Sequence, residues 1–145
     1  MSDYEFTLSL RIRHPRIDPS IITDELGIKP QHTWKAGDRR LDATGEAIEG
    51  SYRESYWMAR LLEQPQLSSE RHSVEGMLMQ TLAQLQRSQS FLERISAEQG
   101  VAELHVSLYA REEFSLPLSA DSLAQLGRLR LAVTFDIHPH SPRAS

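Results

Sequence analysis

Residues 6–27 read FTLSLRIRHPRIDPSIITDELG, and this stretch decides the fold. From residue 6 to residue 12 apolar side chains alternate with polar ones, which is the period-two pattern of a β-strand with one buried face. Helix signals follow directly: Asp18 can cap the free amides, Pro19 suits the first turn, and Gly27 can take the left-handed conformation that ends a helix. The stretch therefore predicts a strand followed by a helix.

A second strand-helix unit occupies residues 102–127, and like the first it ends on Leu-Gly. Its strand places Leu104, Val106 and Leu108 on the apolar side. A last strand over residues 131–138 alternates in the same way. The chain thus predicts two related halves.

The middle of the chain predicts three further pieces. Residues 28–51 contain turn signals, a short strand near residues 31–35 and room for a hairpin. Residues 52–62 are rich in aromatic side chains and predict a full strand. Residues 73–98 carry apolar side chains at helical spacing and predict one long helix, with Gly100 as its stop.

These elements predict an α+β fold. Apolar and polar residues alternate along these strands, whereas the strands of a parallel sheet covered on both faces are continuous apolar runs, so the pattern argues against such a sheet. We expect a two-layer α/β sandwich with a mainly antiparallel or mixed sheet, in which ferredoxin-like duplicated strand-helix-strand halves flank the inserted long helix. Residues 1–138 form a single globular domain in this prediction, and residues 139–145 form a flexible tail.

Composition narrows the class of function. The chain has 145 residues, a net charge of -4 and no cysteine. The negative charge argues against nucleic acid as the partner, and the absence of cysteine excludes disulfides and thiolate ligands. No apolar run is long enough to span a membrane. We expect a cytoplasmic protein that binds neither nucleic acid nor membrane.

Polar side chains gather on one face of the predicted sheet. Arginines on such a face could bind an anionic ligand or a peptide, although an ordinary solvated face is the alternative. The face as a whole carries Thr7, Ser9, Arg11, Arg13, His105, Ser107, Tyr109, Arg130, Thr134, Asp136 and His138. The candidate binding residues on it are Arg11, Arg13, His105, Tyr109, Arg130 and Asp136.

Residues 34–40 combine an aromatic ring, three cations and a glycine turn. The ring could stack on a base and the cations could hold an anion. Alternatively, Trp34 covers the core and Asp38 ties back the turn. Trp34, Lys35 and Asp38 complete the set of candidate binding residues.

The sequence predicts neither a metal site nor a cofactor. His14, His138 and His140 lie at predicted strand ends and three imidazoles could hold zinc, but no metal-binding spacing such as His-Glu-x-x-His is present. His14 also falls at the far end of the sheet if the first and last strands are antiparallel. Neither a nucleophile elbow nor a glycine-rich phosphate loop occurs, so we expect no catalytic residue.

Several short motifs together resemble the bacterial domain-of-unknown-function family 4279. They are Leu-Gly-Ile-Lys-Pro at residues 26–30, Lys-Ala-Gly-Asp at residues 35–38, the aromatic strand with Trp57, and Phe-Asp-Ile at residues 135–137. The resemblance implies a cytoplasmic protein with no assigned reaction, and some relatives are thought to act as immunity-type proteins beside toxins. The last strand departs from the family's Asp-x-Tyr, because His138 follows Ile137.

We therefore predict a non-enzymatic interaction domain that presents its sheet face and the segment 28–51 to a protein or peptide. The alternative is a sensor that binds a small anionic metabolite on the open sheet face. An exposed edge strand could also pair two copies into a homodimer.

Overall fold

The computed structural model describes residues 3–139. Along the chain the elements are β1 (Glu5–His14), α1 (Pro19–Leu26), β2 (His32–Trp34), β3 (Arg39–Leu41), β4 (Ala47–Ser51), β5 (Ser55–Arg60), β6 (Leu67–Ser68), α2 (Val74–Leu85), the 3-10 turn η1 (Gln86–Ser88), α3 (Gln89–Ala97), β7 (Val101–Tyr109), α4 (Ala120–Arg128) and β8 (Leu131–His138).

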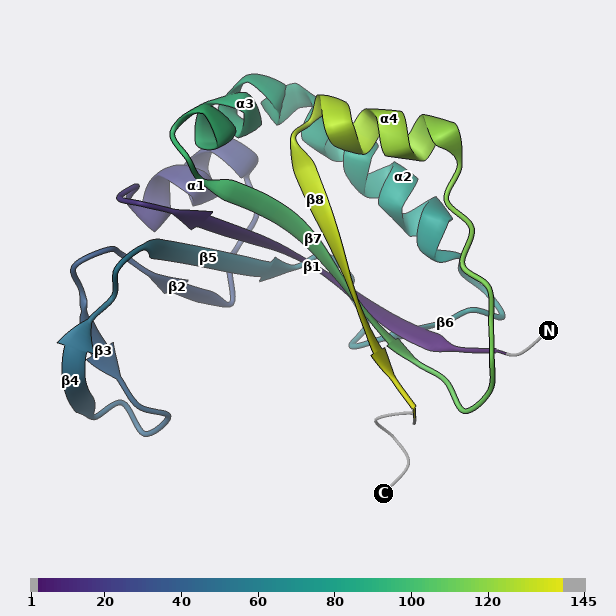
Figure 1. Ribbon diagram of the computed structural model, residues 1–145, viewed down its shortest axis with the longest axis horizontal. Helices are drawn as coiled ribbons and strands as arrows, with labels where there is room; N and C mark the ends of the chain where they lie inside the picture. Colours follow the sequence, from purple (N-terminus) through teal and green to yellow (C-terminus); the bar gives the residue numbers. More distant parts are fainter. Residues whose placement is uncertain (1–2, 140–145) are drawn as a thin grey trace.

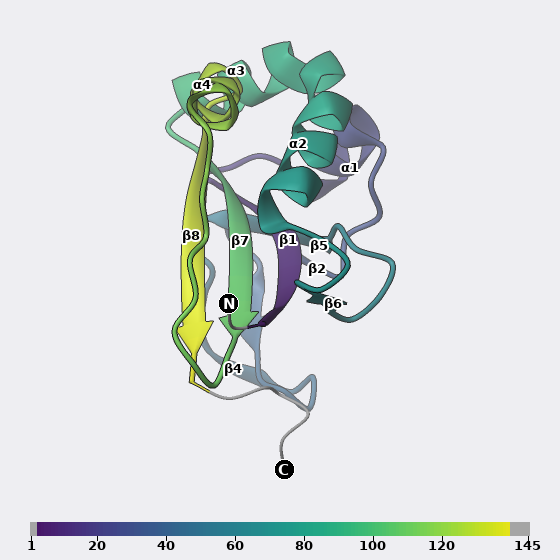
Figure 2. The same ribbon diagram turned by 90° about the vertical axis from the view of Figure 1, so that its right-hand side faces the viewer.

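The main sheet has the strand order β2-β5-β1-β7-β8, and β6 pairs with the first residues of β1. Neighbouring strands are antiparallel except β7 and β8, which are parallel. The helices lie together along one side of this sheet, and the small β3–β4 hairpin stands apart from it (Figure 1). The turned view in Figure 2 shows the strands side by side, with β8 at the edge. A mixed α/β fold with a mostly antiparallel open sheet is confirmed.

The core confirms the predicted alternation of β1. Four apolar side chains of this strand are buried, and the three predicted inward residues of β7 pack beside them. In β5 the buried apolar side chains are Trp57 and Ala59, and α1 contributes Ile22 and Leu26. The buried apolar residues of β1 and β7 are Phe6, Leu8, Leu10, Ile12, Ala102, Leu104, Val106 and Leu108.

Helix α1 begins and ends as predicted. The Asp18 side chain accepts a hydrogen bond from the backbone N–H of Ser20, and Pro19 occupies the first turn. Gly27 has a left-handed backbone with φ of 68°. Both helix ends therefore follow from local signals.

The two halves differ in strand direction, so a ferredoxin-like duplication is not confirmed. β7 and β8 are parallel neighbours joined through α4. β1 and β5 are instead antiparallel neighbours, because the chain passes through β2 and the hairpin after α1 and enters β5 from the opposite end. Only the second half is a parallel strand-helix-strand unit.

The prediction of one long helix over residues 73–98 is wrong. The segment bends at η1, so that α2 packs beside α4 while α3 lies over β7. Ser88 in this bend is buried, and its hydroxyl donates a hydrogen bond of 3.4 Å to the carbonyl of Glu25 in α1. The bend therefore follows from packing against another helix, which the apolar spacing does not record.

Two predicted helix stops are also wrong. Gly127 lies inside α4, and the left-handed residues after α3 and α4 are Gln99, with φ of 68°, and Arg130, with φ of 57°. Gly100 has a different role, because a Cβ there would meet the carbonyl oxygen of Arg13 at 2.8 Å. This glycine permits a close approach of two backbones.

The predicted strand over residues 52–62 is shorter in the structure, where it is β5. Tyr52 does not belong to it: its N–H donates to the carbonyl of Asp38 and its carbonyl accepts from the N–H of Gly37. These two bonds close the base of the β3–β4 hairpin, which the sequence predicts only as a possibility. Residues 39–51 are exposed throughout.

No helix among residues 3–139 combines the length and apolar character that crossing a lipid bilayer requires.

Candidate functional site

The face of the sheet that points away from the core collects the predicted polar side chains, and we call it the polar face. Strand pairing places Ser9 of β1 between Arg60 of β5 and His105 of β7. The same pairing sets Arg11 of β1 opposite Glu103 of β7. Two arginines and a histidine thus lie around the middle of the central strand.

A pocket of about 290 Å³ opens at this point of the polar face, and we call it the sheet-face pocket. Strands β1, β5 and β7 form its floor, and the segment after β5 forms one rim. The lining residues are Thr7, Leu8, Ser9, Arg11, Met58, Arg60, Leu62, Gln64, Pro65, His105 and Ser107. Two of the predicted binding residues, Arg11 and His105, are therefore brought together here.

Arg11 is half-buried in this pocket, and its Nε atom is buried without a hydrogen-bond partner among residues 3–139. The nearest carboxylate in the strand pairing is that of Glu103, but its Oε2 accepts a hydrogen bond of 2.9 Å from the Thr134 hydroxyl. No ion pair joins Arg11 or Arg60 to a carboxylate within the described range. A guanidinium donor thus remains unsatisfied on the pocket wall.

His105 lies on the polar face where the alternation places it, but it is only 7% exposed. Ser107 is buried in the same way. Both lie on β7, which has long strands on either side, so neighbouring side chains cover them. The Nε2 of His105 lies 3.1 Å from an oxygen of Asp136, whose side chain is 60% exposed. Asp136 therefore supports the histidine from outside the pocket lining.

Three other predicted binding residues do not line the pocket. Arg13 lies on the polar face but is exposed. Tyr109 stacks on His138 with 4.7 Å between the ring centroids, farther along the same face. Arg130, predicted on the polar face, lies before β8 in the tight turn that follows α4. Its backbone is left-handed there, with φ of 57°, and it does not line the pocket.

In the turn at residues 34–38, Asp38 has the role that the second interpretation gives it, whereas Trp34 does not. The carboxylate of Asp38 accepts a hydrogen bond of 3.0 Å from the N–H of Lys35, which ties back the turn. Trp34 does not cover the core, however. Its ring stacks on Tyr52 at 4.3 Å and on Tyr56 at 4.5 Å, and its Nε1 donates to a backbone carbonyl. The ring is already stacked within the protein.

A hollow of about 570 Å³ lies between this turn and the start of α1. Its lining includes Lys35 but also the carboxylates of Asp18, Asp24 and Asp38. Hydrogen bonds from Ser20 hold the pKa of Asp18 below its usual value, with Lys35 adding a smaller effect. The surplus of negative charge makes this hollow unsuited to an anion.

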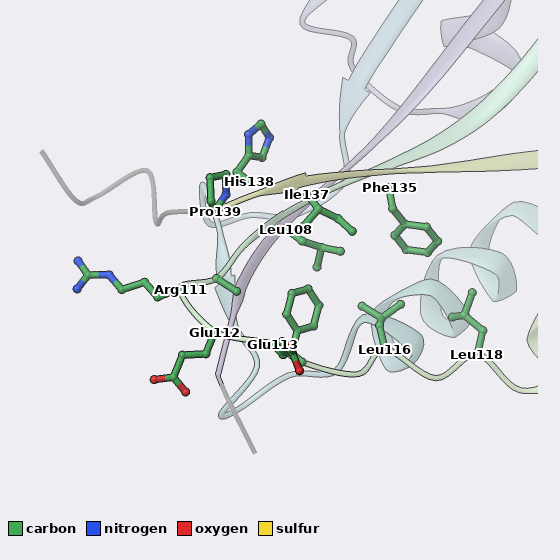
Figure 3. A pocket seen from close by; sticks show the side chains of 12 residues that line it. Leu108, Arg111, Glu112, Glu113, Leu116, Leu118, Phe135, Ile137, His138 and Pro139 are labelled. Atoms are coloured by element: carbon green, nitrogen blue, oxygen red, sulfur yellow. The ribbon is translucent and has the colours of Figure 1, made fainter.

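A larger apolar groove of about 710 Å³ lies beside β8, and we call it the β8 groove. Figure 3 shows Leu116 and Leu118 of the loop before α4 on one side and Phe135 and Ile137 of β8 on the other. Ile137 is 67% exposed. The complete lining is Leu108, Ala110, Arg111, Glu112, Glu113, Phe114, Leu116, Leu118, Phe135, Ile137, His138 and Pro139.

Sequence reasoning missed this groove, although one signal was present. Phe114, Leu116 and Leu118 alternate with other residues in a segment that has no strand of its own. Apolar residues at every second position need a surface to cover. The alternation on β8 supplies that surface, since its apolar side runs past the end of the helical layer.

His14 has a structural role, and a zinc site is not supported. Its Nδ1 accepts hydrogen bonds from the N–H groups of Arg16 and Ile17, and its Nε2 lies 2.8 Å from an oxygen of Glu98. The antiparallel pairing of β1 with β7 places it at the opposite end of the sheet from His138. His140 lies outside the described residues. Within residues 3–139 no group of three histidine or acidic side chains is placed to hold a metal ion.

The two surfaces offer different chemistry. The sheet-face pocket presents hydrogen-bond donors that lack acceptors, which suits an anion. The β8 groove presents apolar side chains beside a free strand edge, which suits an extended chain.

Comparison with known proteins gives one match. A family model described as "Domain of unknown function (DUF4279)" matches residues 4–140, nearly the whole chain. No curated protein and no solved structure matches it.

Proposed function

The chain belongs to the DUF4279 family of domains of unknown function, and from its surfaces we propose that it is a non-enzymatic interaction domain. Its ligand in this proposal is an extended segment of a partner protein that adds to β8 as a further strand. An immunity-type role, which the family resemblance implies, would be one form of such binding.

The free edge of β8 is the first support for this proposal. The carbonyl of His138 accepts a hydrogen bond from the N–H of Ala110, which follows β7. Backbone groups alternate in direction along a strand, so those of Val133, Phe135 and Ile137 point away from β7. No strand within residues 3–139 pairs with this side of β8. A row of donors and acceptors is thus available to a partner strand.

The β8 groove is the observation that carries the proposal. The apolar side of β8 is buried at Leu131, half-buried at Val133 and Phe135, and exposed at Ile137. The protein's own helices therefore stop covering the sheet along this strand. Apolar side chains at every second position of an added strand would enter the groove, while backbone hydrogen bonds would supply affinity.

Charge at the mouth of the groove indicates which partner fits. Arg111, Glu112 and Glu113 are exposed there. The whole chain also carries a net charge of -4. The favoured partner is therefore an extended segment with alternating apolar residues and flanking lysine or arginine.

Selection from displayed random ten-residue peptides tests this proposal. Selected peptides are expected to alternate apolar residues and to carry basic ones. Ile137→Ser should weaken their binding about tenfold, through lost apolar contact. Ile137→Pro should weaken it further, because proline removes an outward N–H without breaking the bonds to β7.

Leu123→Ser is the matched control, since Leu123 on α4 is also an exposed aliphatic residue, at 54%, and does not line the groove. It should leave peptide affinity unchanged. Peptides without alternation, or binding that survives Ile137→Pro, would contradict the proposal. A dimer in light scattering that Ile137→Pro converts to monomer would instead identify a second copy as the occupant of the edge.

A further inference from the structure

The sheet-face pocket has an unbalanced positive charge. Arg11 and Arg60 both line it, and its lining contains no aspartate or glutamate. Carboxylates close by are already engaged: Glu103 accepts from Thr134, and Asp136 pairs with His105. Two guanidinium groups therefore share a concave surface without an acidic partner there.

Because Arg11 is partly buried, this unbalanced charge destabilises the folded protein when no ligand is bound. Its Nε is buried and unpartnered within the described residues, and a buried charged donor without an acceptor destabilises the folded state. The guanidinium presents its donors as a rigid fork that matches two oxygens of one anion. A bound oxyanion would supply the missing acceptor.

Neutral donors surround the two arginines. The hydroxyls of Thr7, Ser9 and Ser107 line the same pocket. No hydrogen bond from any of these hydroxyls to residues 3–139 is present, so each is free to donate to a ligand. His105 is held in place by Asp136 at 3.1 Å. The pocket thus combines charged and neutral donors, as oxyanion sites do.

The pocket also has an apolar wall and a small size. Met58, Leu62 and Pro65 supply its apolar side chains, and its volume is about 290 Å³. This volume is at the lower end for small-molecule sites. We propose that the sheet-face pocket binds the oxyanion group, carboxylate or phosphate, of a small metabolite, whose short apolar part lies against this wall.

Thermal unfolding and titration calorimetry with two probes test the proposal. Inorganic phosphate and butyrate represent the two head groups, with sodium chloride at equal ionic strength as the reference. At ten times its Kd, the fitting probe should raise the unfolding midpoint by about 4 °C. Binding of phosphate alone or of butyrate alone identifies the head group.

Arg11→Gln should raise the Kd of the fitting probe about tenfold or more, because it removes a charge-assisted hydrogen bond. Arg11→Lys keeps the charge but loses the fork, and should give an intermediate Kd. Arg13→Gln is the matched control: it changes the same residue type on the same strand and face, outside the pocket. It should change Kd by less than about twofold, since an exposed charge is screened by salt.

Failure of both probes to raise the midpoint above the chloride reference would overturn the proposal. Equal losses from Arg11→Gln and Arg13→Gln would also overturn it, since the effect would then come from general charge. Ile137→Ser should leave the Kd unchanged, because the β8 groove lies on the other face of the sheet. The experiments on the anion site therefore test it independently of the proposed interaction with a partner strand.

Discussion

At the scale of single residues, His14 joins two distant parts of the chain. Its Nδ1 accepts from two backbone N–H groups, so the proton of the neutral ring lies on Nε2. That proton is donated to Glu98, which follows α3. The turn after β1 is therefore fastened to the end of a helix by one buried side chain.

Replacement of His14 tests this role. His14→Ala should lower the free energy of unfolding by about 2 to 4 kcal/mol, because two backbone N–H groups lose their acceptor. Urea unfolding measures the change. His32→Ala is the control, since His32 is exposed on β2, and it should cost no more than about 0.5 kcal/mol. Similar losses from both variants would contradict the assigned role.

The partner of His14 makes a pH-dependent contribution. The hydrogen bond from His14, with help from Arg94, holds the pKa of Glu98 below its usual 4.5. A carboxyl whose pKa is lowered by folding contributes stability above its unfolded pKa and loses it as pH falls through the folded pKa. Glu98→Gln should therefore cost stability at pH 7, and its deficit should close as pH falls below about 4.5.

Unfolding midpoints between pH 7 and pH 3 measure this closing gap. Glu93→Gln, at an exposed position of α3, the helix that Glu98 follows, should behave like the wild type at every pH. A deficit for Glu98→Gln that stays constant across the range would show that the lost interaction does not depend on the carboxylate charge.

At the scale of elements, alanine substitutions at the two glycines that the sequence predicts as helix stops should have opposite effects on stability. A Cβ at Gly100 would lie 2.8 Å from a backbone oxygen, whereas nothing lies within 4 Å of one at Gly127. Gly100→Ala should destabilise the protein by about 1 to 3 kcal/mol through overpacking. Gly127→Ala should stabilise it by about 0.5 to 1 kcal/mol, because alanine favours the helix.

Thermal unfolding of the two variants side by side checks this pair, and each variant serves as the other's control. A loss of stability in Gly127→Ala would mean that this position is more crowded than the structure has it. No loss in Gly100→Ala would mean that Arg13 and α3 can separate without cost.

Elements with local signals are predictable, and those shaped by packing are not. The alternation of β1 and the caps of α1 are written in consecutive residues, and the structure follows both. No local sequence signal marks the bend between α2 and α3. Apolar spacing runs through it unbroken, and the contact of Ser88 with α1 lies far away in sequence.

At the scale of the whole molecule, the β3–β4 hairpin is an appendage of the main sheet. Every residue from 39 to 51 is exposed, and Asp38 and Tyr52 pair at its base. A two-residue Asn-Gly turn that replaces residues 39–51 should therefore preserve the fold. We expect an unchanged near-ultraviolet circular dichroism spectrum and a midpoint within about 3 °C of the wild type. A lost spectrum would show that the hairpin supports the sheet.

The candidate site was predictable only in part, because it depends on packing between distant strands as well as on local patterns. Alternation places Arg11 and His105 on one face, but the sheet-face pocket exists because β5, with Arg60, lies beside β1. Strand order depends on the path of the whole chain, and no local pattern encodes it. The segment that closes the rim, residues 61–66, has no periodic signal at all.

The central place of β1 has a consequence for how the protein is made. Its long neighbours are β5 and β7, so the strand leaves the ribosome before both of them and completes its pairing only after residue 109. At cellular rates of synthesis this delay is roughly 5 to 20 seconds. During that time an apolar, unpaired strand edge is open to other chains. The nascent protein thus passes through a stage in which its own fold does not yet protect the central strand of its sheet.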